Sequence, residues 1–385
     1  MKTIKTILII IIILVLIPLL SWLLWSFKPS QPLDIMVVNK TVHSFERDEH
    51  RALFWILVHD KYVKPDNNKV YNLNKDYFGF HPIRSTKSRK YDIMRVKLTE
   101  IDNLVDEYDM VYYADTYGVF FNEWYRGRDT DDKGALIEGG LNNNDYLFLK
   151  KMHGEGKLII GEYNFIAPPT DELVRIRTED LFGLHWSGWI GKYFHNLNPD
   201  KNKNIPGWMV DSYENKNNAD WTFTGRGIIL ANQETNDVIV LEEDIHLDIN
   251  VPEIQTTEYG MNNFDIPETV YFPNWFDLTE SIDNQVIAEY KIHVTVDGKS
   301  LLDQYNLSSR FPAIIESSEG SSFYYFCGDF VEYPVAMFTA KLKGINIIEG
   351  IFYNNKPTSH SKFYWTYYQP LINQILENYQ TTVRN

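Results

Sequence analysis

The order of the apolar segments between residues 34 and 165 constrains the fold more than any other feature of the sequence. Runs typical of buried strands alternate with stretches of helical periodicity, and they end in a run at Lys157–Phe165 that breaks at Gly161. The other expected strands are Asp34–Asn39, Ile93–Leu98 and Met110–Ala114, and the expected helices are Asp48–Val63, Glu100–Tyr108 and Asn142–Gly154. This alternation predicts an α/β fold with a mostly parallel sheet flanked by helices.

The pattern changes after the polar stretch Asn196–Asn204. Short β-type runs separated by turn residues follow, which predicts an antiparallel β extension or insertion. Two further strands and an amphipathic helix at Lys362–Asn378 close the chain. We therefore expect residues 34–204 to form the first part of the core, residues 205–305 the extension, and residues 306–385 the return to the core with the C-terminal helix.

The first 27 residues predict a membrane anchor. Ile7–Trp25 contains no charged residue, Lys2 and Lys5 precede it, and Trp22 and Trp25 lie at its far end. At about 1.5 Å per residue such a helix nearly crosses a hydrocarbon core of about 30 Å. A cleaved signal peptide is the alternative, but the run is longer than the usual apolar region and lacks an A-x-A-like site. Residues 1–27 are thus a predicted signal anchor with the N-terminus cytoplasmic, residues 28–33 a linker, and the domain extracytoplasmic.

Charge and cysteine content exclude several classes of function. The 385 residues include 37 basic and 52 acidic ones, for a net charge of −15, which argues against binding to nucleic acid. A single cysteine, Cys327, excludes a disulfide framework and a cysteine-rich metal site. His43, Glu49 and His50 could together bind a metal, but no spacing fixes their geometry. We expect no metal and no cofactor.

Three carboxylates follow predicted strands and form the candidate catalytic set. Asp115, Glu162 and Asp329 each come at or just after the end of a strand, and ligands bind at the carboxyl ends of strands in open α/β sheets. Two carboxylates in one cleft could act as acid and base on a glycosidic bond. In the alternative, each one caps a helix or accepts hydrogen bonds from backbone amides, and Glu162 ties down a loop.

Five further residues are candidate ligand contacts. Glu138 and Gly140 belong to a Glu-Gly-Gly stretch before a helix, where backbone N–H groups could bind an anion, although a simple turn would have the same sequence. Asn164 offers an amide beside Glu162. Tyr117 and Trp189 lie in predicted loops, where their rings could stack on a sugar or pack the loops onto the sheet.

The layout of these segments resembles the class I glutamine amidotransferase-like superfamily, and within it the trehalose-utilisation (ThuA-like) branch. The segments that carry the resemblance are Asp34–Asn39, Tyr108–Asp115, Glu138-Gly139-Gly140 with its helix, Lys157–Asn164 and Ser322–Asp329. The resemblance implies a flavodoxin-like α/β fold with a ligand cleft at the strand ends. Some relatives accompany sugar metabolism or form non-catalytic domains of glycosidases.

The residues needed for glutaminase chemistry are missing. In amidotransferases the central strand ends in G-x-C-x-G, but this chain reads Gly161-Glu162-Tyr163-Asn164 at the matching position. After the final strand, Gly328-Asp329-Phe330 stands where a His-x-Glu would complete the triad. The sequence leaves three hypotheses: a membrane-anchored domain that binds an envelope glycan, a glycan hydrolase that uses a carboxylate pair, or a non-catalytic scaffold for envelope proteins.

Overall fold

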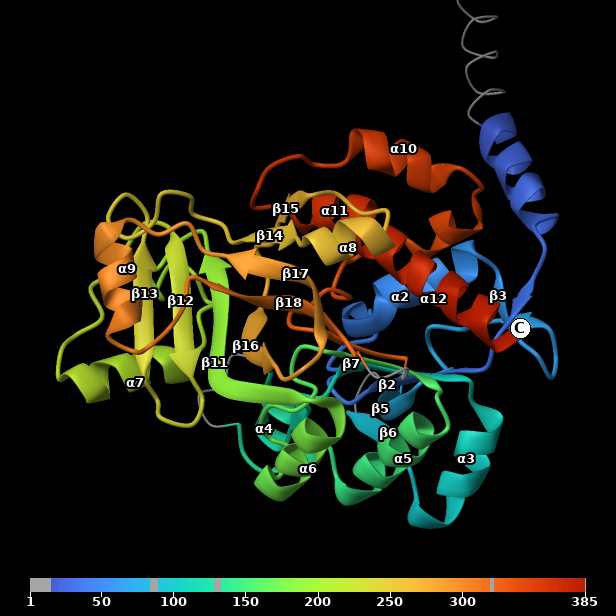
Figure 1. Cartoon of the computed structure of the whole chain (residues 1–385), viewed down its shortest axis with the longest axis horizontal. Coiled ribbons are helices and arrows are strands. Elements are labelled where there is room, and N and C mark those ends of the chain that lie inside the picture. Colours follow the sequence, from blue (N-terminus) through green and yellow to red (C-terminus); the bar gives the residue numbers. More distant parts are fainter. Residues whose placement is uncertain (1–14, 84–88, 128–132, 319–321, 385) are drawn as a thin grey trace, which may run out of the picture.

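The largest sheet of the computed structural model has ten strands and a mixed strand direction (Figure 1). The model describes residues 15–83, 89–127, 133–318 and 322–384. In sheet order the strands are β15 (Thr269–Tyr271), β14 (Glu253–Thr256), β17 (Gln285–Lys291), β18 (Arg310–Glu316), β19 (Phe323–Phe326), β10 (Leu158–Glu162), β7 (Met110–Asp115), β2 (Ile35–Asn39), β5 (Phe78–Ile83) and β6 (Lys90–Met94).

The parallel part of this sheet forms its centre. β19, β10, β7, β2 and β5 pair in parallel, and every residue of β2 and β10 is buried. Helices cover both faces, with α3 (Ile101–Glu107), α5 (Asn143–Gly154) and α6 (Glu172–Phe182) on one side and α2 (Asp48–His59) and α12 (Gln369–Arg384) on the other (Figure 1). Burial on both faces explains why these strands are continuously apolar in the sequence.

The prediction of a mostly parallel sheet is wrong for the sheet as a whole. The strands β14, β15, β17 and β18 come from the second half of the chain and join it in antiparallel pairs. At the other edge, β5 lies in a stretch that looked like an aromatic loop. The expected parallel strand at 93–98 is instead the antiparallel edge strand β6. Hairpin pairing of this kind depends on contacts that the local pattern of apolar residues does not specify.

A second sheet packs beside the first, in the order β13 (Val238–Glu242), β12 (Gly227–Asn232), β11 (Leu184–Phe194) and β16 (Phe276–Ser281). Trp189 was expected in a loop, but it belongs to β11, which has a register shift between Trp186 and Ile190. Gly191 is required there because a Cβ atom would lie 2.4 Å from the Phe276 ring. The glycines of β11 therefore permit close packing and do not form a turn.

The remaining elements are short. They are β1 (Gln31–Pro32), β3 (Tyr62–Lys64), β4 (Lys69–Val70), β8 (Val119–Phe120), β9 (Leu136–Glu138), α4 (Phe121–Arg126), α7 (Gly207–Asn217), α8 (Glu258–Asn263), α9 (Val296–Asp303), a 3-10 turn at Leu98–Glu100 and a π-helical turn at Tyr364–Tyr368. β1 pairs in parallel with β3, so part of the predicted linker is a strand held against the domain.

Residues 15–26 form a helix that projects from the body and is called the N-terminal helix below (Figure 1). Residues 7–14 of the predicted anchor lie outside the described residues. Within the described part of the chain, no helix combines the length and the apolar character needed to cross a bilayer. The indole of Trp25 is buried and donates to the carbonyl oxygens of Val58 and His59, at 3.2 Å each, which holds the end of the helix on α2.

A surface excursion joins the last strand of the main sheet to the C-terminal helix. It runs from Glu332 to His360 and contains a 3-10 turn (Met337–Lys341) and α10 (Ile345–Phe352). No residue of α10 is buried. The excursion ends at α11 (His360–Phe363), which continues through the π-helical turn into α12.

Candidate functional site

The carboxyl ends of β7 and β10 lie side by side in the parallel sheet, because Tyr113 pairs with Gly161 in register. Gly161 is closely packed, since a Cβ atom there would lie 2.8 Å from the ring of Phe165. Asn164 adopts a left-handed conformation with φ 68°, which turns the chain directly after the strand. The expected break at Gly161 is absent, because β10 continues through Gly161 to Glu162, and the turn at Asn164 follows the strand.

Glu162 is fully buried, and its carboxyl group is saturated with hydrogen bonds. The Tyr112 hydroxyl donates to Oε1, and the backbone N–H groups of Phe330 and Val331 donate to Oε2 at 3.2 and 3.1 Å. Its side chain has 0% exposure. Burial raises the pKa of Glu162 to about 8 despite these donors, and the nearby Asp115 adds to the rise. Glu162 thus fixes the loop after β19 to the end of β10 and presents no atom to solvent.

Asp115, which is half-buried, and Asn164, which is buried, form a second layer beside Glu162. The Asp115 Oδ1 accepts the Tyr117 N–H at 2.7 Å and the Asn164 amide at 3.4 Å. Burial raises the pKa of Asp115 to about 6. The backbone carbonyl of Asn164 accepts the hydroxyl of Thr116, which further links the two strand ends.

Asp329 and Glu332 form a pair of carboxyl groups in the loop after β19. Asp329 is half-buried, its backbone N–H donates to the Trp275 carbonyl at 2.9 Å, and the Asn274 amide approaches its Oδ2 at 3.3 Å. Burial, with the charge and hydrogen bond of Glu332, holds the pKa of Asp329 well above its usual range. The charges of Asp115 and Glu162 act in the same direction. A neighbouring negative charge makes the ionisation of a carboxyl group less favourable, so the two groups titrate as a pair.

Lys192 brings a positive charge to this carboxyl pair from the second sheet. It is a half-buried side chain of β11 whose Nζ lies 5.0 Å from the centre of the Trp275 ring. Burial lowers its pKa, while the charges of Glu332 and Asp329 oppose that change. The ammonium group therefore compensates a locally acidic site.

An open cleft of about 540 Å³ lies over this group of charges. Its wall includes Asp48, Lys192, Tyr193, His195, Asn274, Glu332, Thr358 and His360. Burial lowers the pKa of His360 to about 4, so the ring is neutral at pH 7. Its Nε2 lies 3.3 Å from the Phe330 carbonyl and must carry the proton, which makes Nδ1 an acceptor. Among the described residues nothing is hydrogen-bonded to that Nδ1 atom.

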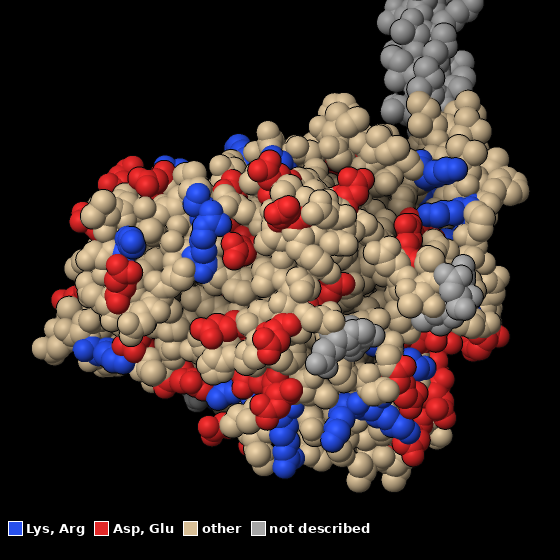
Figure 2. All heavy atoms as spheres, in the orientation of Figure 1, with Lys and Arg blue, Asp and Glu red and all other residues tan. Residues whose placement is uncertain are grey.

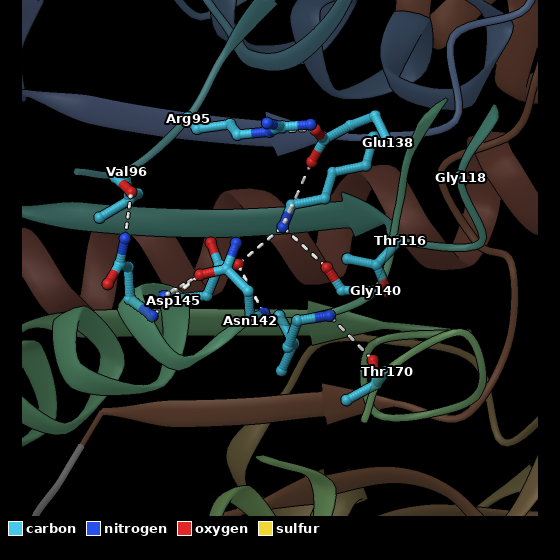
Figure 3. A network of polar contacts seen from close by, with 12 residues as sticks. Arg95, Val96, Thr116, Gly118, Glu138, Gly140, Asn142, Asp145 and Thr170 are labelled. Carbon is cyan, nitrogen blue, oxygen red and sulfur yellow. Dashed lines mark hydrogen bonds and ion pairs between the residues drawn. The ribbon is translucent and has the colours of Figure 1, made fainter. Parts of the chain in front are cut away.

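Glu138 and Gly140 have structural partners instead of ligands (Figure 3). The Gly140 N–H donates to the Thr116 carbonyl at 2.7 Å, so it is not directed at an anion. Glu138 is paired with Arg95, and it lies 3.7 Å from the ammonium group of Lys40. Lys40 also donates to Asp145 and to the Gly140 carbonyl, at 2.7 Å each. The residues expected to form an anion-binding turn thus enclose a buried lysine of the protein itself.

The two aromatic candidates, Trp189 and Tyr117, do not line the cleft among the residues that the structure describes. Trp189 is buried in β11 and packs against Tyr305 at a ring distance of 5.7 Å. It is three residues from Lys192, and strand alternation places the two side chains on opposite faces. Tyr117 follows Asp115, but its hydroxyl contacts Glu123 at 3.2 Å and accepts from Lys133. His43 approaches Glu123 at 3.5 Å, and His50 contacts Asn39 at 2.6 Å, so these two histidines have separate partners.

Sequence reasoning missed the residues that line the cleft. Lys192 is the single charged residue in the aromatic and apolar run from Trp189 to Phe194, which was a usable signal. Asp48 is the first residue of an expected helix, and nothing in the sequence around it indicated a site. The sequence around Glu332 and His360 did not indicate a site. The two residues are far apart in the sequence and come together only in the folded chain.

No protein-family model matches the chain, and no curated protein sequence matches it. Among solved structures, it is similar to a β-galactosidase from Bacillus circulans sp. alkalophilus, with 8% identity and a TM-score of 0.35 over 81% of this chain and 31% of that one. It is also similar to ThuA-like proteins from Bacteroides uniformis and Parabacteroides merdae. The former has 9% identity and a TM-score of 0.35 over 86% of this chain and 97% of that one. The latter has 8% identity and a TM-score of 0.32 over 77% and 79%.

The chain spans about a third of the length of the β-galactosidase, since 31% of that protein is covered. TM-scores of this size do not establish a shared fold or a shared activity. The class that the coordinates themselves define is a mixed α/β protein with flanking helices.

Proposed function

We propose that the chain is a membrane-anchored extracytoplasmic domain that binds an envelope glycan in the cleft lined by Glu332, Lys192 and His360. The observation that carries the proposal is the cleft itself, whose wall brings Lys192, Glu332 and His360 together from distant segments of the chain.

The character of the wall supports an uncharged, hydroxyl-rich ligand. Lys192 offsets nearby carboxylates, so neither sign dominates, while Asn274 and Thr358 supply neutral donors and acceptors. A volume of about 540 Å³ lies within the range of about 300–1,000 Å³ that small-ligand sites occupy. Anchoring by residues 7–25 is supported by the uncharged run in the sequence.

We expect Lys192→Met to weaken glycan binding roughly 10- to 100-fold, because a hydrogen bond from a charged donor contributes about 1.5–3 kcal/mol. The measurement is calorimetric titration of the full chain in detergent micelles with a panel of soluble envelope-glycan fragments. Lys299→Met is the matched control, since Lys299 is an exposed lysine on α9.

Two outcomes would contradict this proposal. Equal affinity in the Lys192→Met variant and the wild type would place the ligand outside the cleft. If the wild type bound none of the fragments, the scaffold for envelope proteins would be the remaining hypothesis.

The carboxyl pair favours hydrolysis of the glycan as a second candidate function. The raised pKa of Asp329 favours its protonated form, so Asp329 can act as an acid beside Glu332. Asp329→Asn separates the two functions, because a hydrolase would lose about 10²-fold or more in rate and still bind its substrate. Turnover by the wild type, measured as release of reducing ends, is required for this candidate to stand.

A further inference from the structure

The outer face of α10 is apolar and uncovered. Ile347, Ile348, Ile351 and Phe352 have exposed fractions between 52% and 78%. Their spacing of one and four residues places them on one side of the helix. Phe338 in the preceding 3-10 turn adds a further exposed ring, with an exposed fraction of 76%. A contiguous apolar surface of this kind marks an interaction site.

This face is joined to the N-terminal helix. The Ser21 hydroxyl donates to the Lys343 carbonyl at 3.0 Å, and the Lys343 N–H donates back to the Ser21 carbonyl at 3.3 Å. The N-terminal helix itself exposes an apolar surface, from Val15 to Leu24. In Figure 1 it projects from the same side of the molecule on which α10 lies, and in Figure 2 the surface over α10 is largely without charge.

The charges and rings around this junction match a membrane interface. Lys61 and Lys341 lie 5.6 and 5.7 Å from the centre of the Trp25 ring. Tryptophan and lysine are the residues that gather at the boundary between hydrocarbon and water. If Trp25 marks that boundary, Ser21 lies four residues further in, or about 6 Å along the helix axis. Interfacial helices bury their apolar face to a depth of about 5–10 Å.

We propose that α10 is an interfacial helix that docks on the lipid bilayer beside the N-terminal anchor. The inference rests on the proposed membrane anchoring and adds a second contact that fixes the orientation of the domain. The occupant of the apolar face is the acyl-chain boundary of the same leaflet that the N-terminal helix enters. Continuity with that helix at Ser21 favours lipid over a second copy of the chain.

The test places an environment-sensitive nitrobenzoxadiazole label at Ile348→Cys in the full chain, reconstituted in vesicles of phosphatidylcholine and phosphatidylglycerol. Cys327 is fully buried, so the unsubstituted chain reports background labelling. Ile17→Cys, on the N-terminal helix, reports anchoring, and Lys299→Cys on α9 is the control outside the membrane. We expect label at 348 to be quenched by lipids carrying a nitroxide near the headgroup more strongly than by lipids carrying one deep in the chain.

Each alternative result overturns the docking of α10 in a distinct way. Quenching at 17 but not at 348 would leave the anchor in place and show that α10 stays in water. A blue-shifted emission at 348 without quenching by lipid would place α10 against protein, such as a second copy. Absence of quenching at both positions would overturn the anchoring, and the docking with it.

Discussion

Lys40→Met is expected to lower the free energy of unfolding by about 3–5 kcal/mol, the usual cost of leaving buried charges without their partner. The side chains of Lys40, Asp145 and Glu138 are 4%, 2% and 3% exposed, so water cannot replace the lost ammonium group. Lys40 also donates to the Gly140 carbonyl and thereby holds the turn before α5 against the end of β2 (Figure 3). Urea unfolding monitored by tryptophan fluorescence measures the change.

The surface provides a matched control for this variant. Lys151 pairs with Asp102 at 2.6 Å, but the two side chains are 39% and 83% exposed. Solvent screens such a pair, so Lys151→Met should lower the free energy of unfolding far less than Lys40→Met does. If Lys40→Met and Lys151→Met had similar effects, the buried network would contribute little to stability.

The stability of the Glu162→Gln variant should rise relative to that of the wild type as the pH increases from about 4.5 to about 8. A glutamine can direct its carbonyl oxygen to the Phe330 and Val331 N–H groups and its amide to the Tyr112 oxygen, so the fold is preserved. Tyr112 can then turn its own hydroxyl hydrogen toward Tyr368, whose hydroxyl oxygen is 2.8 Å away. The comparison therefore isolates the ionisation of one carboxyl group.

The sign follows from the pKa of Glu162, which burial raises to about 8 in the folded protein. Below pH 4.5 the carboxyl is protonated in both the folded and the unfolded chain and contributes nothing. Between 4.5 and 8 only the unfolded chain releases the proton, so rising pH favours unfolding by up to about 1.4 kcal/mol per pH unit. Above pH 8 the Glu162 carboxyl is ionised in both the folded and the unfolded chain, so stability falls no further.

Buried groups that do not interact with Glu162 change stability with pH equally in both proteins. Burial raises the pKa of Asp277 to about 6 and lowers that of His50 to about 3, and these effects cancel in the difference between variant and wild type. Glu280→Gln is the control, since Glu280 is exposed on β16. If the difference in unfolding free energy between Glu162→Gln and the wild type stayed constant from pH 4.5 to 8, Glu162 would be ionised in the folded protein.

The central strands could be predicted from the sequence, whereas the edges could not. β2, β7 and β10 are buried on both faces, so the apolar run itself defines them, and Asn142 caps α5 through a capping box that the sequence displays. β5 and β6 form an antiparallel pair at an edge, where a strand needs no continuous apolar run. β11 escaped prediction because Gly188 and Gly191 serve a register shift and close packing.

The candidate site shows the same division between local and long-range information. Because Asp115, Glu162 and Asp329 follow predicted strands, we expected them to lie together. In the structure the charge of Asp115 raises the pKa of Glu162, and both charges raise the pKa of Asp329. The burial of each carboxyl group could not be predicted, because it depends on which residues the second sheet covers. Lys192 and His360 come from β11 and α11, which pack beside the strand ends only through contacts between distant segments.

The excursion that carries α10 has a mechanical consequence. It leaves the body at Glu332 and returns at His360, and both residues belong to the wall of the cleft. Between these two ends the excursion is also held on α2, because the Trp55 indole donates to the Thr339 hydroxyl at 2.9 Å and the His59 ring contacts the Ala340 carbonyl at 3.1 Å. A load applied to α10 is therefore transmitted both to α2 and, through Glu332 and His360, to the wall where a ligand would bind.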